Sequence, residues 1–504
     1  MNGRIRTGAR IVEALFVEGG RVVVAGTSEE IRRSRSTGTE NHDLGGRWVL
    51  PGLVDAHLHL KETVLARTGV DLHRSRTIAE MIGRVEEALP APPGGPLFGW
   101  GWDQEELEER RFPTRDELDR LPTQRPVVLY RACHHVAVAN SAALDFAGLT
   151  DGALDPPGGR LGRSEGRLNG TLWEEALTLL LPLEAAAFSS AGEAIRRFVA
   201  EAASVGLTTI APMNAAPGEI EIVRNACRRE GLPVRLRPYL RASTLAVRPR
   251  LPLRSDDGIR WAGVKIVADG SFGARTAWLT EPYSDSPGEA GWPHGDMEDL
   301  AASIGRATAS ELGVAIHAIG DRALERVLTA LASEPTVGRP RIEHASLTPP
   351  PVIERLAELA PVLVVQPRFV PSDWWLSERL GEERARWTYA FRSLLERGLT
   401  LAGSSDSPIE PFDPWTGLAA AVASRPGRSS SERLEGETAL SMYTSAAGEA
   451  LGEKAIGSLE PGSYGDLVLL ASGDLTGAIG AGARSVLATY HDGVSSYRRP
   501  EALG

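Results

Sequence analysis

The chain has 504 residues, of which 42% are hydrophobic and 24% are charged. That is enough apolar material for a sizeable core, and neither glycine nor proline is periodic or abundant enough to indicate a fibrous or disordered chain. Lys and Arg number 55 against 66 Asp and Glu, a formal net charge of −11, which argues against a nucleic acid partner.

Cysteine content and the distribution of apolar residues indicate the compartment that we expect for the protein. Its two cysteines, Cys133 and Cys227, cannot form a disulfide framework and suit a reducing compartment. The first residues lack the apolar stretch of a signal peptide, and no apolar run is long enough to span a membrane. We therefore expect a cytoplasmic protein that acts on a small molecule, with neither membrane nor nucleic acid as partner.

Short β-rich segments stand at both ends of the chain. They occupy residues 10–17 and 20–25 near the start, and 465–470 and 485–490 near the finish. We predict that residues 1–50 and 410–504 together form one small β-sandwich-like domain, with helices in its C-terminal part.

Between the two ends, short apolar segments alternate with helical patterns, as expected for parallel strands buried on both faces. The predicted strands are residues 53–57, 207–211, 234–239, 263–268, 314–317, 341–344, 363–366 and 400–403. The predicted helices are residues 191–205, 219–230, 297–312, 323–332, 350–359 and 384–397. This α/β pattern favours a (β/α)₈ TIM barrel over residues 51–60 and 183–409, with an open doubly wound sheet as the alternative.

A long insertion interrupts this alternation. About 150 residues separate the first two predicted strands, far more than a loop in a compact barrel needs. Residues 61–182 must therefore carry their own structure, and we predict an inserted subdomain over the barrel mouth. It contains a proline- and glycine-rich segment at 90–96 and a tryptophan-bearing turn at 99–103.

Four histidines end or closely follow predicted strands: His57, His59, His317 and His344. In a barrel, the active site lies at the carboxyl ends of the strands. His57 and His59 are separated by one residue, so both side chains leave the same face of an extended segment and can hold one divalent ion. Each histidine alone fits a core position, but the four placements together predict a metal centre.

Asp406 and Lys265 complete the set of candidate ligands. Asp406 follows the last predicted strand, where a carboxylate can bind a metal and accept a proton from the water that it activates; a helix N-cap is the alternative. Lys265 interrupts an apolar run, and burial of its amine favours the neutral form, which can react with carbon dioxide. The resulting carbamate could bridge two ions. The alternative is an ion pair with Asp269 or Glu174.

Three further residues are candidates for binding substrate: His135, Trp102 and Arg275. His135 lies in the insertion and could reach the barrel mouth. A core position for Trp102 and an ion pair for Arg275 are the alternatives. The remaining histidines of polar segments, which we expect to be solvated, are His42, His73, His294 and His491.

Taken together, these motifs resemble the amidohydrolase superfamily, specifically the branch that includes N-substituted formamide deformylases and YtcJ-like proteins. The likeness rests on Pro-Gly-Leu-Val-Asp-Ala-His-Leu-His at 51–59, Gly-Val-Lys-Ile-Val-Ala-Asp-Gly-Ser at 263–271, His-Ala-Ile-Gly-Asp-Arg-Ala at 317–323, Arg-Ile-Glu-His-Ala at 341–345 and Gly-Ser-Ser-Asp-Ser-Pro at 403–408. The insertion matches the same branch at 101–103, 114–119, His135 and 140–144.

The resemblance implies a distorted barrel, a β-sandwich from both termini, and one or two divalent ions, usually zinc. His57 and His59 would bind the more buried ion with Asp406, while His317 and His344 would hold the second, bridged by Lys265 if it is carboxylated. The implied activity is hydrolysis of a non-peptide carbon–nitrogen bond in an amide, formamide or cyclic amide, with Asp406 as general base. The family also suggests a homodimer.

The sequence departs from the family pattern in two places. The second strand continues into Ala-Pro-Met-Asn at 211–214, and Cys133-His134 replaces the usual Asp-Gly before His135. Deaminases of the superfamily typically carry a glutamate three residues after the fifth-strand histidine, and here that position is Gly320. A mononuclear deaminase, an esterase and a non-catalytic binding barrel are the alternative functions.

Overall fold

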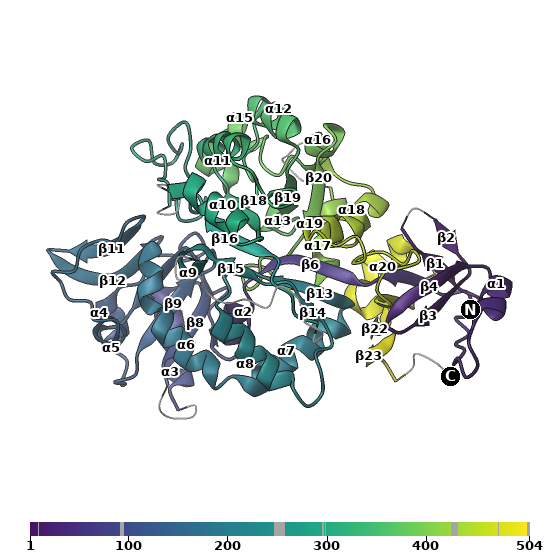
Figure 1. Ribbon diagram of the computed structural model, residues 1–504. Helices are drawn as coiled ribbons and strands as arrows, with labels where there is room; N and C mark the ends of the chain where they lie inside the picture. The colour runs from purple at the N-terminus through teal and green to yellow at the C-terminus, as the bar shows by residue number, and fades with distance from the viewer. Residues whose placement is uncertain are drawn as a thin grey trace.

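The computed structural model describes residues 1–8, 10–90, 95–245, 258–294, 297, 299–424, 432–471 and 473–500. Two parallel sheets lie in the middle, a sheet of the insertion lies at one end, and a sheet from both termini lies at the other (Figure 1). Residues 91–94 of the proline- and glycine-rich segment are outside the described residues. No helix in the described ranges is long and apolar enough to cross a bilayer.

The two central sheets contain only parallel strands, at the positions that the sequence predicts. Their orders are β14-β13-β6 and β15-β16-β17-β18-β19-β20. The strands are β6 (Leu53–Leu58), β13 (Leu207–Pro212), β14 (Arg235–Leu236), β15 (Tyr239–Arg241), β16 (Gly263–Val267), β17 (Gly313–Ala318), β18 (Arg341–His344), β19 (Val362–Val365) and β20 (Thr400–Gly403). Most of their residues are buried, which explains the continuous apolar runs in the sequence.

The described strands form two sheets instead of the single closed barrel that we predict. The expected strand 234–239 is divided into β14 and β15 at Pro238, which has no N–H to donate to a ladder. The chain changes partner there: the N–H of Arg237 donates to Ile210 O at 3.0 Å, and the N–H of Ala262 donates to Pro238 O at 2.9 Å.

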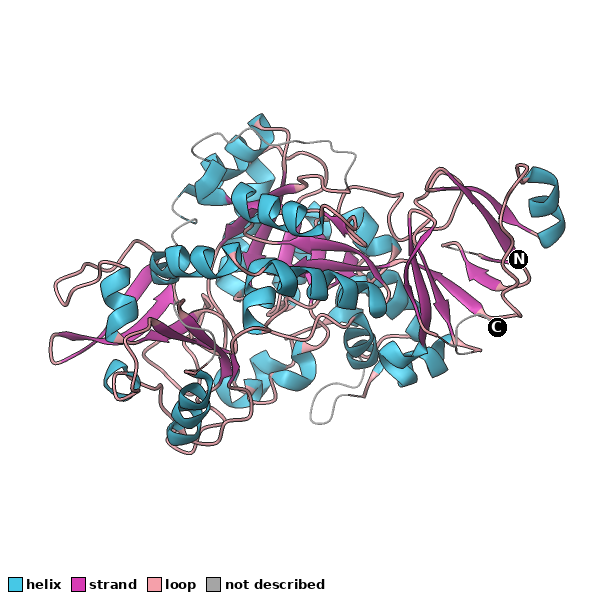
Figure 2. Ribbon diagram, turned by 90° about the horizontal axis from the view of Figure 1, so that it is seen from below, coloured by secondary structure: helices cyan, strands magenta, loops and turns pink. Residues whose placement is uncertain are grey.

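Helices cover the outside of the central sheets (Figure 2). They include α7 (Gly192–Ser204), α8 (Pro217–Cys227), α10 (Leu300–Ala309), α11 (Asp321–Ser333) and α12 (Pro350–Leu359). The predicted helix 384–397 is instead split into α15 (Glu382–Ala385) and α16 (Phe391–Glu396). The split occurs because the N–H of Tyr389 donates to Ser346 O and that of Thr348 to Trp387 O, which joins this segment to the loop after β18.

The insertion forms its own six-stranded sheet in the order β11-β12-β10-β9-β8-β7. Its strands are β7 (Val70–Asp71), β8 (Leu97–Trp102), β9 (Val127–Arg131), β10 (Val136–Ala139), β11 (Gly159–Ser164) and β12 (Arg167–Glu174). The accompanying helices are α2 (Leu60–Ala66), α3 (Ile78–Ala88), α4 (Arg115–Leu118), α5 (Ser141–Phe146), the 3₁₀ helix η1 (Glu175–Leu180) and α6 (Leu181–Ser189).

Strands from both termini meet in one sheet of order β2-β1-β5-β21-β22-β23, beside a separate β3-β4 hairpin. The strands are β1 (Arg4–Arg6), β2 (Ile11–Val12), β3 (Ala14–Glu18), β4 (Arg21–Gly26), β5 (Trp48–Pro51), β21 (Leu467–Leu470), β22 (Val486–His491) and β23 (Val494–Arg498). The remaining helices are α1 (Ser28–Ser34), α9 (Ala242–Leu245), α13 (Phe369–Ser372), α14 (Leu376–Leu380), α17 (Pro414–Val422), α18 (Gly436–Met442), α19 (Ser445–Ala450), α20 (Leu475–Ala481) and the 3₁₀ helix η4 (Gly482–Ser485).

Arg235 of β14 connects a central sheet to the terminal sheet. Its Nη2 lies 3.0 Å from Asp466 Oδ1, and the guanidinium also contacts Asp492. The guanidinium carbon lies 3.5 Å from the ring centroid of Tyr464. Both Arg235 and Asp466 have side chains only 4% exposed. The pair is therefore a buried charge contact between two parts of the fold.

We expect Arg235→Ala to lower the free energy of unfolding by about 3–5 kcal/mol, because it leaves the Asp466 carboxylate buried without its cation. Urea denaturation followed by circular dichroism measures the change. Arg10→Ala is the control, since the Arg10–Glu460 pair is exposed and contributes little. An unfolding midpoint of Arg235→Ala equal to that of the wild type would contradict the prediction.

Candidate active site

The carboxyl ends of five central strands bring the predicted ligands to one place. The residues that the structure assembles there are His57, His59, Lys265, His317, His344 and Asp406, and all but His59 are buried. His57, His317 and His344 belong to β6, β17 and β18, Lys265 belongs to β16, and Asp406 follows β20. In parallel α/β folds this edge is where catalytic groups collect.

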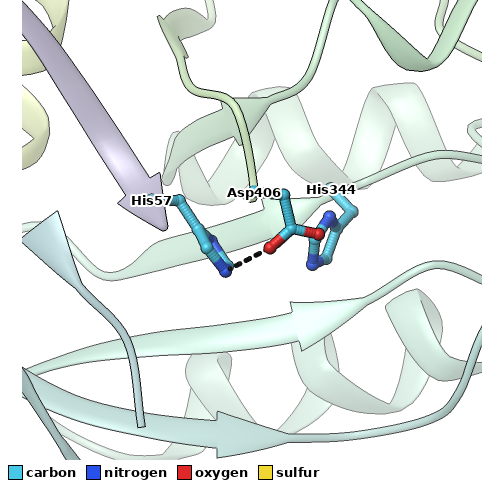
Figure 3. A group of neighbouring side chains, drawn as sticks. All are labelled: His57, His344 and Asp406. Atoms are coloured by element: carbon cyan, nitrogen blue, oxygen red, sulfur yellow. Dashed lines mark ion pairs between the residues drawn. The ribbon is translucent and has the colours of Figure 1, made fainter. Parts of the chain in front are cut away.

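One oxygen of Asp406 faces two histidines. The Nε2 atoms of His57 and His59 lie 3.1 and 3.2 Å from Asp406 Oδ1. Oδ1 is buried and has no hydrogen-bond partner among the described residues. The ligand atoms of His57, His344 and Asp406 lie within 4.8 Å of one another, and Figure 3 shows the carboxylate between the two rings. Imidazole nitrogens and a carboxylate oxygen around one point form a donor set suited to a divalent metal.

Hydrogen bonds on the far side of each ring determine which nitrogen is available. His57 Nδ1 lies 2.5 Å from Glu343 Oε2, and His344 Nδ1 lies 2.8 Å from Gln366 Oε1. Because both oxygens are acceptors, each Nδ1 carries the hydrogen and each Nε2 keeps its lone pair. The His317 ring has the opposite orientation: its Nε2 lies 3.1 Å from the carbonyl oxygen of Gly270, so Nδ1 is the nitrogen left available to bind a metal.

Buried acids around the centre escaped our sequence-based predictions. Glu343 is bound by Arg341 through two contacts of 2.9 and 3.0 Å. Burial raises the pKa of Glu343, but Arg341 and His57 outweigh it and keep that pKa below its usual range. Asp55 accepts hydrogen bonds from Ser405, yet burial raises its pKa to about 7. The available signal was a charged residue inside an otherwise apolar strand.

Lys265 stands beside the first histidine of the centre. Its Nζ lies 3.4 Å from His57 Nε2, and burial lowers the pKa of the amine to about 8, against the opposing charges of Glu343 and Asp406. Neither alternative ion pair is found in the described part of the chain. Asp269 instead accepts the backbone N–H groups of Trp278, Ile319 and Gly320, and Glu174 pairs with His135.

Backbone conformation at the centre is strained. Asp406, His344 and Ala345 have φ values of 57°, 72° and 43°, in the left-handed region that non-glycine residues seldom adopt. Such positions cost of order 1–3 kcal/mol each and collect at functional sites. The fold therefore holds the candidate ligands His344 and Asp406 in place against a local conformational preference.

A cavity of about 1220 Å³ opens over the candidate ligands. The insertion supplies one side of it, including Trp100, Tyr130, His134 and His135. The rings of Trp100 and Tyr130 are stacked with centroids 4.4 Å apart, and His134 stacks on Trp100 at 4.9 Å. His135 also lines the cavity, and its ring centroid lies 5.4 Å from that of His317.

Two of the predicted substrate contacts lie elsewhere. Trp102 is fully buried in the core of the insertion, where Nε1–H donates to Leu129 O at 3.0 Å. Alternation along β8 would put it on the same face as Trp100, but Gly101 has φ 96° and the register with β9 shifts there, so the two rings diverge. Arg275 binds Asp285 at 2.7 Å and does not line the cavity.

Histidines outside the centre also differ from expectation. His294 is 8% exposed, lines the cavity and lies 3.0 Å from Glu175, although its polar sequence context indicated a solvated position. His491 is largely buried as well, next to Asp466 at 3.6 Å. Local polarity did not reveal that both segments fold against other parts of the chain.

A model of the amidohydrolase family matches residues 40–497. The chain belongs to the amidohydrolase family. The resemblance drawn from the strand-end motifs is therefore confirmed, and the buried histidines and Asp406 lie where those motifs place them.

This amidohydrolase is 33% identical to the putative amidohydrolase YtcJ of Bacillus subtilis over 92% of the chain and 91% of that protein. It is 28% identical to the N-substituted formamide deformylase of Arthrobacter pascens over 99% of the chain and 98% of that protein. An uncharacterized metal-dependent hydrolase from Pyrococcus horikoshii OT3 superposes with a TM-score of 0.78 at 32% identity, covering 96% of this chain and 99% of that one.

The cavity wall of the amidohydrolase contains a carboxyl group that is sensitive to pH. Burial raises the pKa of Glu410 from 4.5 to about 7, although Arg368 lies 3.3 Å away. Between these two values the native protein holds the proton more tightly than the unfolded chain, so stability falls as pH rises through this window. The shift corresponds to at most about 3 kcal/mol.

We expect Glu410→Gln to remove this dependence. The variant should unfold at a higher urea concentration than the wild type at pH 8 and at nearly the same concentration at pH 4.5. Unfolding midpoints at both pH values test it. An equal difference between the two proteins at both pH values would show that the carboxyl does not titrate in this range.

Proposed function

We propose that this amidohydrolase hydrolyses a non-peptide carbon–nitrogen bond in an amide, formamide or cyclic amide, using one or two divalent metal ions such as Zn²⁺. One observation supports this proposal above all others. The Nε2 atoms of His57 and His59 both face Asp406 Oδ1, a buried oxygen without a hydrogen-bond partner in the described part of the chain. A buried carboxylate with no hydrogen-bonding partner is costly, and a bound cation would remove that cost.

The residues present fit the expected ions. His57, His59 and Asp406 would hold the first ion, and His344 and His317 would hold the second. The Glu343 and Gln366 contacts support this assignment, because metal-binding histidines commonly donate their other ring N–H to a carboxylate or amide oxygen. Lys265 would bridge both ions as a carbamate, and its lowered pKa favours the neutral amine that this modification requires.

A divalent ion bound there supplies a Lewis acid for the carbonyl oxygen and lowers the pKa of water. Asp406 takes the proton from the attacking water on its carboxylate and returns it to the nitrogen of the leaving amine. Glu343 keeps His57 in one tautomer throughout. The insertion lines one side of the cavity over the centre with Trp100 and Tyr130.

The proposal extends to the architecture. We treat the two parallel sheets over 51–60 and 183–409 as one distorted (β/α)₈ barrel, with 61–182 as the inserted subdomain and 1–50 plus 410–504 as the β-sandwich-like unit. Parallel pairing of Ala215 with Leu240 and the hydrogen bonds between residues 57–59 and 406–407 support continuity at the two gaps between the sheets. The amide-type substrate is supported by the relative named as an N-substituted formamide deformylase.

Metal content provides the first test. We expect wild-type protein purified without chelators to hold two ions per chain, and Lys265→Ala to hold one or fewer, because the bridging ligand is lost. Elemental analysis measures both. One ion in each protein would point to a single-metal site without a carbamate, and no ion after incubation with Zn²⁺ would refute a metal-dependent hydrolase.

Catalysis provides the second test. Zinc-loaded enzyme should release amines from a library of N-substituted formamides, amides and cyclic amides, and Asp406→Asn should lower kcat about 10²–10⁴-fold because the proton acceptor is lost. Metal content measured in parallel separates loss of the base from loss of an ion. Asp413→Asn is the matched control: Asp413 lines the same cavity and caps α17, and asparagine also caps helices well. A fully active Asp406→Asn enzyme would exclude Asp406 as the base.

A further inference from the structure

The insertion places a fifth histidine at the end of a row of rings. The row is His59, His57, His344, His317 and His135, with neighbouring centroids 5.4, 5.1, 4.5 and 5.4 Å apart. His57, His344 and His317 belong to strands of the central sheets and His59 directly follows β6, whereas His135 lies between β9 and β10 of the insertion. The ring centroids of His135 and His317 are as far apart as those of His57 and His59. The latter two rings face the same oxygen of Asp406.

A buried carboxylate holds the fifth ring through Nδ1, as side-chain oxygens hold the rings of His57 and His344. His135 Nδ1 lies 2.6 Å from Glu174 Oε2, and the Glu174 side chain is 3% exposed. This repeats the contacts of His57 with Glu343 and of His344 with Gln366. With Nδ1 occupied, Nε2 is the ligand atom that remains. A carboxylate behind an imidazole is the usual support of a metal-binding histidine.

The support is built into the fold at a cost. Glu174 has φ 51°, and its Oε1 is buried without a hydrogen-bond partner. Gly270 makes room for it, because a Cβ there would lie 2.3 Å from Glu174 Oε1 and 2.0 Å from Thr276 Oγ1. The carbonyl of the same glycine lies 3.1 Å from His317 Nε2. One backbone position therefore arranges both His317 and the partner of His135.

We propose that His135 is a ligand of the second metal ion, together with His317 and His344. The inference rests on the proposed two-ion function. It adds His135 to the candidate ligands that lie at the ends of the central strands, namely His57, His59, Lys265, His317, His344 and Asp406. Three histidine nitrogens are a common ligand set of catalytic zinc. Glu174 is the positioning residue for His135, so the insertion completes the metal centre in addition to covering it.

Zinc binding alone tests the assignment. Protein freed of metal by chelation and dialysis is titrated with Zn²⁺, and the dissociation constant of each ion is measured. His135→Ala should weaken the second ion about 100-fold or more and leave the first within about twofold, since loss of a ligand exceeds the 10–100-fold effect of losing its support. His134→Ala is the matched control, because that ring lines the same cavity but stacks on Trp100.

Substitutions of Glu174 distinguish support of the ligand from general damage. Glu174→Ala should weaken the second ion about 10–100-fold. Glu174→Gln should bind it nearly as tightly as the wild type, because glutamine can accept the same hydrogen bond, as Gln366 does for His344. Thermal melting of each metal-free variant checks the fold, and His135→Gln replaces His135→Ala if the latter is unstable. The visible spectrum of the Co²⁺-loaded protein should change in His135→Ala and stay as in the wild type in His134→Ala.

The outcomes separate this inference from the proposed function. If wild type takes up two ions and His135→Ala takes up both with equal affinity and an unchanged Co²⁺ spectrum, His135 is not a ligand, although the metal centre stands. If the wild type takes up one ion, weaker binding of that ion by His135→Ala would support His135 as a ligand. Unchanged binding of that ion would exclude it. If wild type takes up none, both proposals fail together.

Discussion

Two backbone hydrogen bonds between the first and last central strands determine the geometry of the site. The N–H of His59 donates to Ser407 O at 2.7 Å, and the N–H of Asp406 donates to His57 O at 2.8 Å. Because the side chains of His57, His59 and Asp406 leave from these same residues, the register of two backbone contacts sets the ligand distances. The left-handed conformation of Asp406 follows from this constraint, since its carboxylate and its N–H must both turn towards β6.

Charge balance around this contact explains why so many polar groups are buried together. The Arg341 guanidinium neutralises Glu343, which in turn fixes His57. Asp269 is stabilised by backbone N–H groups instead of a cation. Asp406 differs, because among the described residues its buried Oδ1 has no hydrogen-bond partner, whereas both carboxylate oxygens of Glu343 and of Asp269 accept hydrogen bonds. This oxygen faces the Nε2 atoms of His57 and His59, which is the position where a cation would bind.

Most of the central sheets and the clustering of the candidate ligands could be predicted from the sequence, because buried parallel strands and strand-end histidines have local patterns. What failed depended on contacts between distant segments. Pro238 moved the third strand to a different partner, and the shift at Gly101 separated the faces of Trp100 and Trp102. Arg275 pairs with Asp285 only because the loop after β16 folds back on itself. No local pattern encodes these tertiary placements.

The insertion illustrates how a shared centre can acquire a specific environment. The strand-end motifs require no residue of its sheet, yet three residues of the insertion line the cavity: Tyr130 of β9, Glu174 of β12, and His135 from the turn between β9 and β10. Tyr130 donates to Glu184 at 2.5 Å, and Glu184 binds the buried Lys61 at 2.6 Å, directly after α2 begins. This chain of contacts links the aromatic wall to the segment that follows His59. Buried polar contacts therefore join the insertion to the helix that begins directly after His59, so the cavity wall and the first histidine pair are fixed to the same element.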